Sequence, residues 1–511
     1  MSGLTEKLLA AFNRLHWLLQ WLVLSLLALL LYAPVIGNYF VNDDFVVLRK
    51  VCLDGQLNTD GFFRPLSDIS IYINYLFSEL HPGPYRVASI VIHALNAMLL
   101  LHFCRQWQWA GDEGLRNLFA ILSALFFLTY PFHNEAVAWL LGRASLLAST
   151  FALLSLVILS GRRRESRKML LVALCYFLGL AAYESVLVLP GMVLIWLLAN
   201  GTPARKMIWW MALMAFVLVA HFAVRILVSG SATGEYGAQL FDWDVAAAFG
   251  RAAKAAARTL APPLSPVAFL TTAAILGLVL LTAVIMVWRK SSQQTYVRIQ
   301  LLAWLSMLLV AMVIPFVFGV STNTSESDRL LYFPSAFLCS LLAFLLLHLL
   351  YGKKWMPWVV GAVLVYNILF LEQNNQNWRH ASDAVTSLLK TIKDNPLQGK
   401  IFVVNLPDQW DGAYLFRIGF KEALIVTGID TSRVEAVNTA DMREMKKLQV
   451  TDHSFTNGKL FIPPGLYVQH AGSQPPARGV NEQVLFVRDT DKIIYWNGSR
   501  WTLLQAHQVF N

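Results

Sequence analysis

The sequence of 511 residues contains few charged side chains, because only 14% are Asp, Glu, Lys or Arg. Soluble globular domains carry about 25%, so this shortage excludes an ordinary soluble protein. The first apolar run extends from Trp17 to Val35 without a charged residue, and runs of about 18 or more such residues are typical of membrane-spanning helices. This run is too long for a signal-peptide core and has no small-residue cleavage pattern, so we expect a retained signal anchor.

Cysteine is also scarce, and the sequence has neither an internal repeat nor a low-complexity tract. The four cysteines are scattered and three of them lie in apolar runs, which excludes a disulfide framework and a cysteine-based metal site. They are Cys52, Cys104, Cys175 and Cys339. The net charge of +10 does not indicate nucleic-acid binding here, because basic residues anchor the cytoplasmic loops of membrane proteins.

Eleven apolar segments predict eleven membrane spans. They cover approximately residues 15–36, 86–105, 117–131, 144–160, 169–183, 185–200, 207–227, 265–288, 299–319, 330–350 and 355–371. Lys and Arg gather in alternate loops. This pattern predicts that those loops and the N-terminus lie on the cytoplasmic side of a bacterial inner membrane. Segments 37–85, 132–143, 228–264 and 320–329 and the tail from about 372 would then face the periplasm.

The predicted fold is a polytopic α-helical membrane protein with periplasmic amphipathic helices and a small C-terminal domain. Segments 64–80 and 244–260 carry apolar or basic stripes at helical spacing, as helices at a membrane surface do. After residue 370, short alternating segments indicate strands, and Pro463-Pro464-Gly465 and Asn497-Gly498 indicate turns. We therefore divide the chain into a transmembrane domain (1–371), a linker or helix (372–394) and an α/β or α+β periplasmic domain (395–511).

The first candidate site is Asn42-Asp43-Asp44, directly after the first span. Two adjacent carboxylates repel each other and lose hydration at a membrane surface, so one pKa should rise toward that of a general base. The alternative is a solvated loop or a helix cap.

The second candidate is a run from Tyr130 that contains His133, Glu135 and Arg143. An arginine fork suits phosphate oxygens, but interfacial anchoring with a buried Arg–Glu pair explains the same residues. Further charged candidates lie at the outer ends of spans or on outer loops, where carboxylates and basic stripes suit an anionic lipid ligand or simple headgroup contact. They are Glu184, Glu326, Arg329 and the stripe Arg251, Lys254 and Arg258.

Together these motifs resemble the GT-C glycosyltransferases. An aspartate pair after the first span is followed by Phe63-Arg64-Pro65-Leu66, by an HxEAVxxxxGRAxLL-like run and by an (E/D)RxLYxPS-like run. Over about residues 15–350 the chain is most similar to the transmembrane O-mannosyltransferases that carry TPR repeats, and more distantly to the protein O-mannosyltransferases. Two departures are a small domain in place of the TPR array and Tyr183-Glu184 in place of a Lys-Glu pair.

The resemblance implies inverting transfer of a sugar, such as mannose, from a polyprenyl-phosphate donor to a hydroxyl of a periplasmic protein or glycolipid. Asp43 would be the general base and Asp44 would position it or take its place. Arg143, Arg251, Lys254 and Arg258 would bind the donor phosphate, with Arg64, His133, Glu135, Glu184, Glu326 and Arg329 in support. No cofactor is required. A divalent metal could sit beside the two carboxylates, although the resembled enzymes do not imply one.

Two other functions fit parts of the sequence. An O-antigen ligase or polymerase also has many spans and basic periplasmic loops, but relies on Arg and His in a large late loop. A transporter or flippase for a lipid-linked sugar would carry charged or Gly/Pro-broken spans near the bilayer midplane, whereas the charges here gather at one face. We further expect the C-terminal domain to be separate from catalysis and to help receive the acceptor. In an alternative interpretation it only braces the periplasmic loops.

Overall fold

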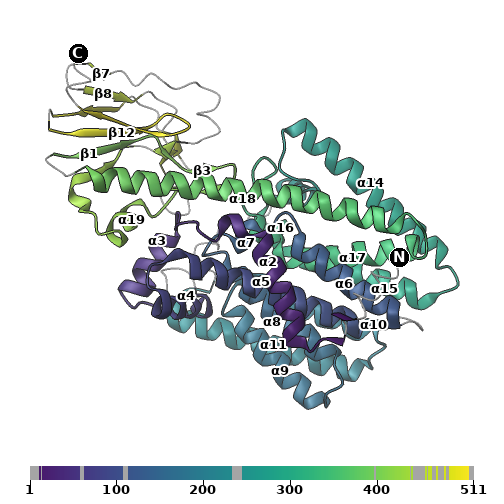
Figure 1. Cartoon of the computed structure of the whole chain (residues 1–511). Helices are drawn as coiled ribbons and strands as arrows, with labels where there is room; N and C mark the ends of the chain where they lie inside the picture. Colours follow the sequence, from purple (N-terminus) through teal and green to yellow (C-terminus); the bar gives the residue numbers. More distant parts are fainter. Residues whose placement is uncertain are drawn as a thin grey trace. The chain divides into compact units, whose positions relative to one another are not determined.

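The computed structural model describes residues 11–12, 14–57, 63–107, 113–232, 244–395, 399–437, 439–440, 455–456, 459–462, 468–469, 477–478, 483–488 and 490–505. Helices dominate the first part of the chain and short strands the last part (Figure 1). The chain divides into two compact units. The first contains Met1–Ile36, Asn58–Ser70 and Pro84–Asn375, and the second contains Gly37–Leu57, Ile71–Gly83 and Gln376–Asn511.

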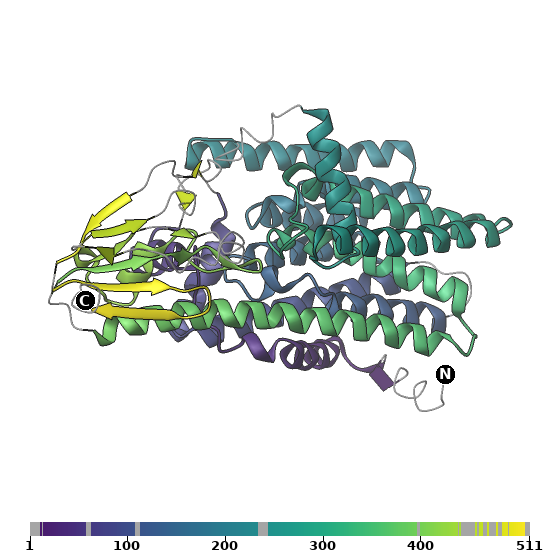
Figure 2. The ribbon, with the colours of Figure 1, turned by 90° about the horizontal axis from the view of Figure 1, so that it is seen from above.

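The first unit is a bundle of helices that run roughly side by side (Figure 2). Its long helices are α2 (Trp17–Leu31), α5 (Pro82–Gln106), α6 (Glu113–Thr129), α8 (Arg143–Ser160), α9 (Glu165–Leu180), α10 (Leu189–Ala199), α11 (Ala204–Ser229), α14 (Pro266–Lys290), α15 (Thr295–Ala311) and α17 (Tyr332–Leu350). Each of the eleven predicted spans overlaps one of these helices or α18 (Met356–Asp394).

Six of the described helical segments are long and apolar enough to cross a membrane, and three shorter apolar helices accompany them. The chain is therefore a multi-pass membrane protein, while the count of eleven spans stays a prediction. α17 packs against α6 and α15, and 89% of its apolar stretch is buried. Only 6% of the corresponding stretch of α14 is buried, so its exposed leucines and valines form a surface that suits lipid.

Short elements connect the helices where the sequence places its polar motifs. They are η1 (Ala33–Val35), α7 (Asn134–Val137), η3 (Glu184–Val188), α13 (Val245–Arg258), α16 (Val313–Phe318) and η5 (Asp328–Leu331). The predicted helix at 244–260 is confirmed as α13, and the carboxylate of Asp244 caps it by accepting from Ala246 N and Ala247 N. The predicted helix at 64–80 is confirmed as α4 (Pro65–Ser78). Their place at a membrane surface stays a prediction.

The helix α18 continues for 39 residues without a break (Figure 1). The last predicted span, 355–371, and the predicted linker, 372–394, are therefore parts of one helix. The sequence has no glycine or proline between residues 362 and 394 that would stop it.

The second unit contains a four-stranded mixed sheet with the strand order β13-β12-β1-β5. Parallel pairs join β1 (Ile401–Val404) to β12 (Lys492–Trp496) and β5 (Val434–Ala436), and β13 (Trp501–Gln505) pairs antiparallel with β12. Asn497 forms the predicted turn, because its Oδ1 accepts from Ser499 N and Arg500 N. The second unit therefore combines helices with a mixed sheet, while its place in the periplasm stays a prediction.

The other strands of the second unit form small separate sheets. A three-stranded antiparallel sheet has the order β11-β8-β7, and the remaining strands are paired in twos. Their bounds are β2 (Leu406–Pro407), β3 (Gln409–Trp410), β4 (Ala413–Tyr414), β6 (Thr439–Ala440), β7 (Phe455–Thr456), β8 (Lys459–Ile462), β9 (Val468–Gln469), β10 (Ala477–Arg478) and β11 (Gln483–Phe486). The predicted turn at 463–465 lies outside the described residues.

The short helices described in the second unit include α3 (Asp44–Val47), η2 (Leu48–Leu53), α19 (Phe420–Val426) and η6 (Thr431–Arg433). α3 and η2 come from the loop after the first span and pack against α19 of the tail. The compact unit of the tail thus includes residues 37–57 and 71–83, which the sequence-based division assigned to the transmembrane domain.

Gly142 lies in backbone contact with an earlier part of the same HxEAVxxxxGRAxLL-like run. A Cβ atom at this position would lie 2.1 Å from the carbonyl oxygen of Glu135 and 2.7 Å from Cα of Ala136. We predict that Gly142→Ala lowers the free energy of unfolding by at least about 1–3 kcal/mol, the usual cost of overpacking. Thermal unfolding in detergent measures this loss.

Gly277, in the middle of α14, is the matched control. A Cβ atom there meets nothing within 4 Å, so Gly277→Ala should be neutral or stabilise the helix by up to about 1 kcal/mol. Equal melting temperatures for the two variants would contradict the packing argument at Gly142.

Candidate active site

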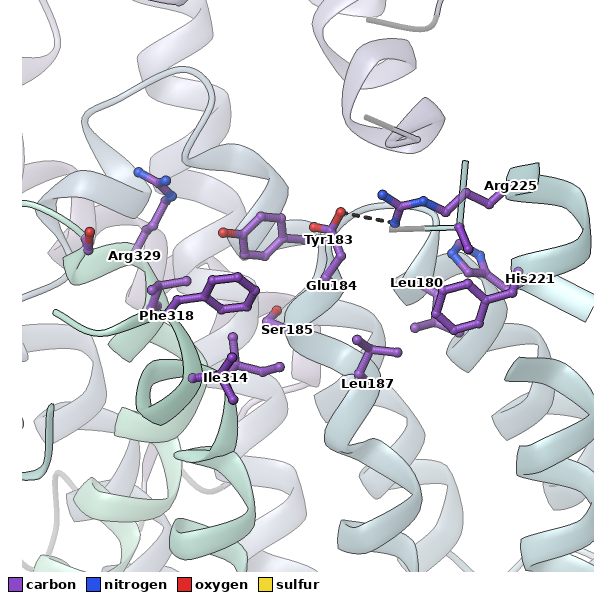
Figure 3. Close-up of a pocket in the computed structure, with 15 residues that line it drawn as sticks. Leu180, Tyr183, Glu184, Ser185, Leu187, His221, Arg225, Ile314, Phe318 and Arg329 are labelled. Atoms are coloured by element: carbon purple, nitrogen blue, oxygen red, sulfur yellow. Dashed lines mark hydrogen bonds and ion pairs between the residues drawn. The ribbon is translucent and has the colours of Figure 1, made fainter. Parts of the chain in front are cut away.

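A cavity of 310 Å³ lies within the helix bundle of the first unit. Residues from the end of α9 and η3, from α11, and from α16 and η5 line it. The polar lining residues are Tyr183, Glu184, Ser185, His221, Arg225, Ser327 and Arg329, and the apolar ones are Leu180, Leu187, Phe222, Ala232, Ile314, Val317, Phe318 and Leu330. Figure 3 shows the charged side chains at one end, with Phe318, Ile314 and Leu187 below them.

Glu184 lies between two arginines at the charged end. Its Oε2 accepts from Arg64 Nη2 at 2.9 Å and from Nε at 3.1 Å, and its Oε1 accepts from Arg225 Nη1 at 3.3 Å. The Arg64 guanidinium also lies over the Tyr183 ring, 4.5 Å from its centroid. Two guanidinium groups therefore share the Glu184 carboxylate, and one of them, that of Arg225, lines the cavity.

The lining also contains buried polar atoms without a hydrogen-bond partner. They are Arg225 Nε, His221 Nδ1 and Ser185 Oγ, and Arg225 and His221 are each 3% exposed. Buried polar groups in proteins are almost always hydrogen-bonded. These three atoms offer polar partners to whatever enters the cavity.

Arg225 and His221 are site residues that the sequence analysis missed. Both fall inside the predicted span 207–227, which was treated as a plain apolar segment. The signal was present, since an ionisable residue within a membrane span is a candidate for function.

Two of the sequence motifs meet in the structure. Glu135 Oε2 accepts from Arg329 N at 3.0 Å, and its Oε1 forms an ion pair with the Arg329 guanidinium, which also lies 5.1 Å from the centroid of the Trp139 ring. The sequence-predicted residues Glu135 and Arg329 are thus brought together, and Arg329 also lines the cavity.

His133 makes a second contact between the same two motifs, because its Nε2 is 2.7 Å from Ser335 Oγ. The side chain is fully buried, and burial holds the pKa of His133 well below its usual value. A neutral buried imidazole of this kind links the two motifs without adding a charge to the interior.

Arg143 is occupied by the protein itself. Its guanidinium donates to Tyr85 O at 2.7 Å, Ser70 O at 3.2 Å and Ser89 Oγ at 3.2 Å. The side chain is 1% exposed and does not line the cavity. These contacts fasten the start of α8 to α4 and α5, and the predicted role in donor binding stays a prediction.

The structure separates the three residues of the predicted basic stripe, Arg251, Lys254 and Arg258. Arg258 is fully buried: it donates to Asp328 Oδ2 at 2.7 Å and to Ala261 O at 3.0 Å, and lies 4.0 Å from the centroid of the Phe132 ring. Arg251 and Lys254 instead line a second cavity of 310 Å³, together with Phe318, Gly319, Val320, Ser321, Glu326 and Ser327. The two cavities share Phe318 and Ser327, so they are neighbours.

The two aspartates after the first span belong to the second unit and differ in their surroundings. Asp44 is fully buried and its Oδ2 accepts from Val41 N at 3.2 Å, whereas Asp43 is partly exposed. Of the two residues, Asp43 is therefore the more accessible, although its Oδ1 is buried.

An acidic residue outside the sequence-predicted set, Asp68, has a raised pKa. Asp68, on α4, is 5% exposed, and burial raises its pKa to about 7 although the nearby Arg64 charge lowers it. The sequence analysis did not select this residue. Among the described residues, no three His, Cys, Asp or Glu side chains are arranged to hold a metal ion.

The helices define a multi-pass membrane protein, and its first unit contains a cavity with charged and apolar lining residues. No protein-family model matches the sequence. Curated relatives match parts of it: protein O-mannosyl-transferase TMTC3 of Homo sapiens is 35% identical over 91 residues, or 18% of this chain and 9% of the relative. A protein O-mannosyl-transferase of Caenorhabditis elegans is 24% identical over 228 residues, or 41% and 32%.

These matches confirm the resemblance to the O-mannosyltransferases that the motifs predicted, although the chain spans less than a third of the length of these relatives. Among solved structures, ArnT from Cupriavidus metallidurans bound to undecaprenyl phosphate aligns with a TM-score of 0.45 and 14% identity. That alignment covers 87% of this chain and 92% of the other.

The buried Arg258–Asp328 pair offers a test of whether Arg258 supports the fold or binds the donor. Arg258→Met leaves a buried carboxylate uncompensated, so we predict a loss of about 3–5 kcal/mol in the free energy of unfolding. Adding Asp328→Leu should restore most of it, because an apolar pair can replace a buried ion pair. Thermal unfolding in detergent gives both values.

The double variant should still be stabilised by added polyprenyl phosphate, since Arg258 lines neither cavity. A double variant that melts like the wild type but no longer responds to polyprenyl phosphate would return Arg258 to the donor site. The exposed Lys400–Glu435 pair is the control, because Lys400→Met should cost less than about 1 kcal/mol.

Proposed function

We propose that the chain is an inverting glycosyltransferase that moves a sugar from a polyprenyl phosphate to an acceptor hydroxyl on the periplasmic side of a bacterial inner membrane. The observation that carries this proposal is the cavity of the first unit, which combines an end that carries Arg225 and Arg329 with an apolar body. A polyprenyl phosphate has the matching chemistry, with a charged phosphate joined to a long hydrocarbon. The sequence relatives, which are named as protein O-mannosyl-transferases, support sugar transfer and favour mannose.

Arg225 and Arg329 are the residues that we assign to the donor phosphate. Both line the cavity, and Arg225 has an Nε–H without a partner there. An arginine fork binds phosphate through parallel charge-assisted hydrogen bonds. This assignment replaces Arg143 by Arg225 and Arg329, because Arg143 already donates to two backbone carbonyls.

The apolar lining receives the first part of the hydrocarbon chain. Leu187, Ile314 and Phe318 lie on one side of the charged groups (Figure 3). Apolar side chains of this kind gain roughly 25 cal/mol for each Å² of ligand surface that leaves water. The neighbouring cavity adds Arg251 and Lys254, which supply more positive potential around the leaving phosphate.

Asp43 is the residue that we assign as general base, from its partial exposure and from the resembled motif. It takes the proton of the acceptor hydroxyl while the oxygen forms a bond to the anomeric carbon. The bond between that carbon and the phosphate oxygen breaks from the opposite side, and the phosphate leaves with the electron pair. Arginines stabilise the charge that develops on the phosphate, and no acid is needed for such a leaving group.

The acceptor is a hydroxyl of a periplasmic protein or a glycolipid in this proposal. The relatives' names favour a protein. Mass spectrometry of glycans and glycoproteins from a knockout strain, compared with its parent, would identify the acceptor. A transporter of lipid-linked sugar makes and breaks no glycosidic bond. The purified protein would therefore leave the sugar attached to its lipid donor.

Arg225→Gln should weaken binding of polyprenyl phosphate about tenfold to a hundredfold. A hydrogen bond to a charged group is worth about 1.5–3 kcal/mol, and each 1.4 kcal/mol changes affinity about tenfold. Ligand-induced shifts of the melting temperature measure the affinity. The control is Arg289→Gln, at the other end of the bundle in the last turn of α14. Equal affinities in both variants would remove Arg225 from the site.

Asp43→Asn should lower turnover about 10²–10⁴-fold, the usual contribution of a general base, while the melting temperature stays near the wild-type value. The assay follows release of mannose from a polyprenyl-phosphate mannose. Asp44→Asn is the companion variant, and it should destabilise the protein because Asp44 is buried and hydrogen-bonded. Near-normal turnover in purified Asp43→Asn would refute the assignment.

A further inference from the structure

The loop that carries Asp43 is fastened to the C-terminal tail within the second unit. Asn42 N donates to Leu415 O at 2.7 Å, and Asn42 Oδ1 accepts from Ile418 N at 2.8 Å. One residue further on, a Cβ atom at Gly419 would lie 2.5 Å from Asn42 O. Two hydrogen bonds and one backbone contact therefore act on Asn42, the residue directly before Asp43.

The backbone conformation of Asn42 depends on these contacts. Its φ is +50°, in the left-handed region that non-glycine residues rarely adopt, although asparagine tolerates it better than most. Such a conformation persists where the surroundings determine it. Because the conformation of Asn42 directs the chain into Asp43, the tail fixes the direction in which that carboxylate leaves the loop.

Further contacts hold the two segments in register. The Phe45 ring stacks on Phe416, with centroids 6.4 Å apart and planes 12° apart, and α19 packs against α3 and η2. Arg49 and Glu422 form an ion pair at 3.6 Å. The hydrogen-bonded end of the tail therefore continues into an apolar contact, and the loop cannot shift without moving α19.

We infer that Asn42 and Gly419 are positioning residues for Asp43, and that the C-terminal domain is part of the catalytic apparatus through this clamp. The inference rests on the proposed function, in which Asp43 is the base. It revises the expectation that the tail is separate from catalysis. A shift of about 1 Å in a catalytic group can lower a rate 10²-fold, so the clamp matters for turnover rather than for donor binding.

Gly419→Ala tests the clamp, with Gly428→Ala as its matched control. Both glycines have left-handed φ values, +82° and +73°, but a Cβ atom at Gly428 meets nothing within 4 Å. The two alanines therefore carry the same kind of backbone strain, and only the first presses on Asn42. We expect kcat for mannose release to fall at least tenfold in Gly419→Ala with the donor KM within twofold, and to stay near wild type in Gly428→Ala.

Hydrogen exchange of the full-length protein gives a readout that does not need activity. Amides of residues 39–48 should exchange faster in Gly419→Ala than in Gly428→Ala. Asn42→Gly is the second variant in case Gly419→Ala does not fold. It keeps the left-handed backbone and the bond to Leu415 but loses the bond to Ile418, so it should show a smaller fall in kcat.

The outcomes separate the inference from the proposed function. If the wild type releases no mannose, the proposed function fails and the inference falls with it, whatever the exchange rates show. If the wild type is active and Gly419→Ala matches Gly428→Ala in kcat and in exchange, the clamp alone is overturned. A rise in donor KM with unchanged kcat would also overturn it, because the tail would then act on donor binding.

Discussion

The pairing of Glu184 with both Arg64 and Arg225 is the interaction on which the cavity depends. A charge buried in a helix bundle is tolerated only when it is paired and hydrogen-bonded. Here two guanidinium groups share one carboxylate, and the buried Nε of Arg225 has no hydrogen-bond partner. The arrangement joins three chain segments, and the Arg225 side chain also lines the cavity. An anionic ligand that enters the cavity therefore meets the Arg225 guanidinium without having to displace Glu184.

The motif residues around this cluster fall into two groups: a frame of paired side chains that join chain segments, and a lining that faces the cavity. Glu135 with Arg329, Asp328 with Arg258, and His133 with Ser335 are buried pairs that join distant segments. Each pair fixes the entry of one chain segment relative to another. Only Arg329 belongs to both groups, because it is held by Glu135 and also lines the cavity. The frame thus sets the position of a charged residue that a ligand can meet.

The sequence predicted the helices well, whereas the contacts of the arginines emerge only from the structure. All eleven apolar segments became helical, because apolar length is a local property that tertiary contacts do not override in a membrane. In the sequence, Arg143 and Arg258 are candidates of the same kind as Arg251. In the structure, Arg143 donates to backbone carbonyls and Arg258 to the Asp328 carboxylate, and these partners lie far away in the sequence. Arg225 was missed for the opposite reason, since its span looked complete without it. Partner identity depends on tertiary packing, which residue spacing does not encode.

The contact between the tail and the aspartate loop was invisible in the sequence for a different physical reason. Leu415 contributes its carbonyl and Ile418 its N–H, so backbone atoms carry two of the three contacts, and any residue type offers the same atoms. Only the side chain of Asn42 and the missing side chain of Gly419 are specific. A tail of different architecture could therefore hold the same loop, provided that it presents one carbonyl, one N–H and one position without a Cβ. The loop can therefore keep its motif while the sequence of the tail segment that holds it changes, because most of what the tail contributes to Asn42 is backbone.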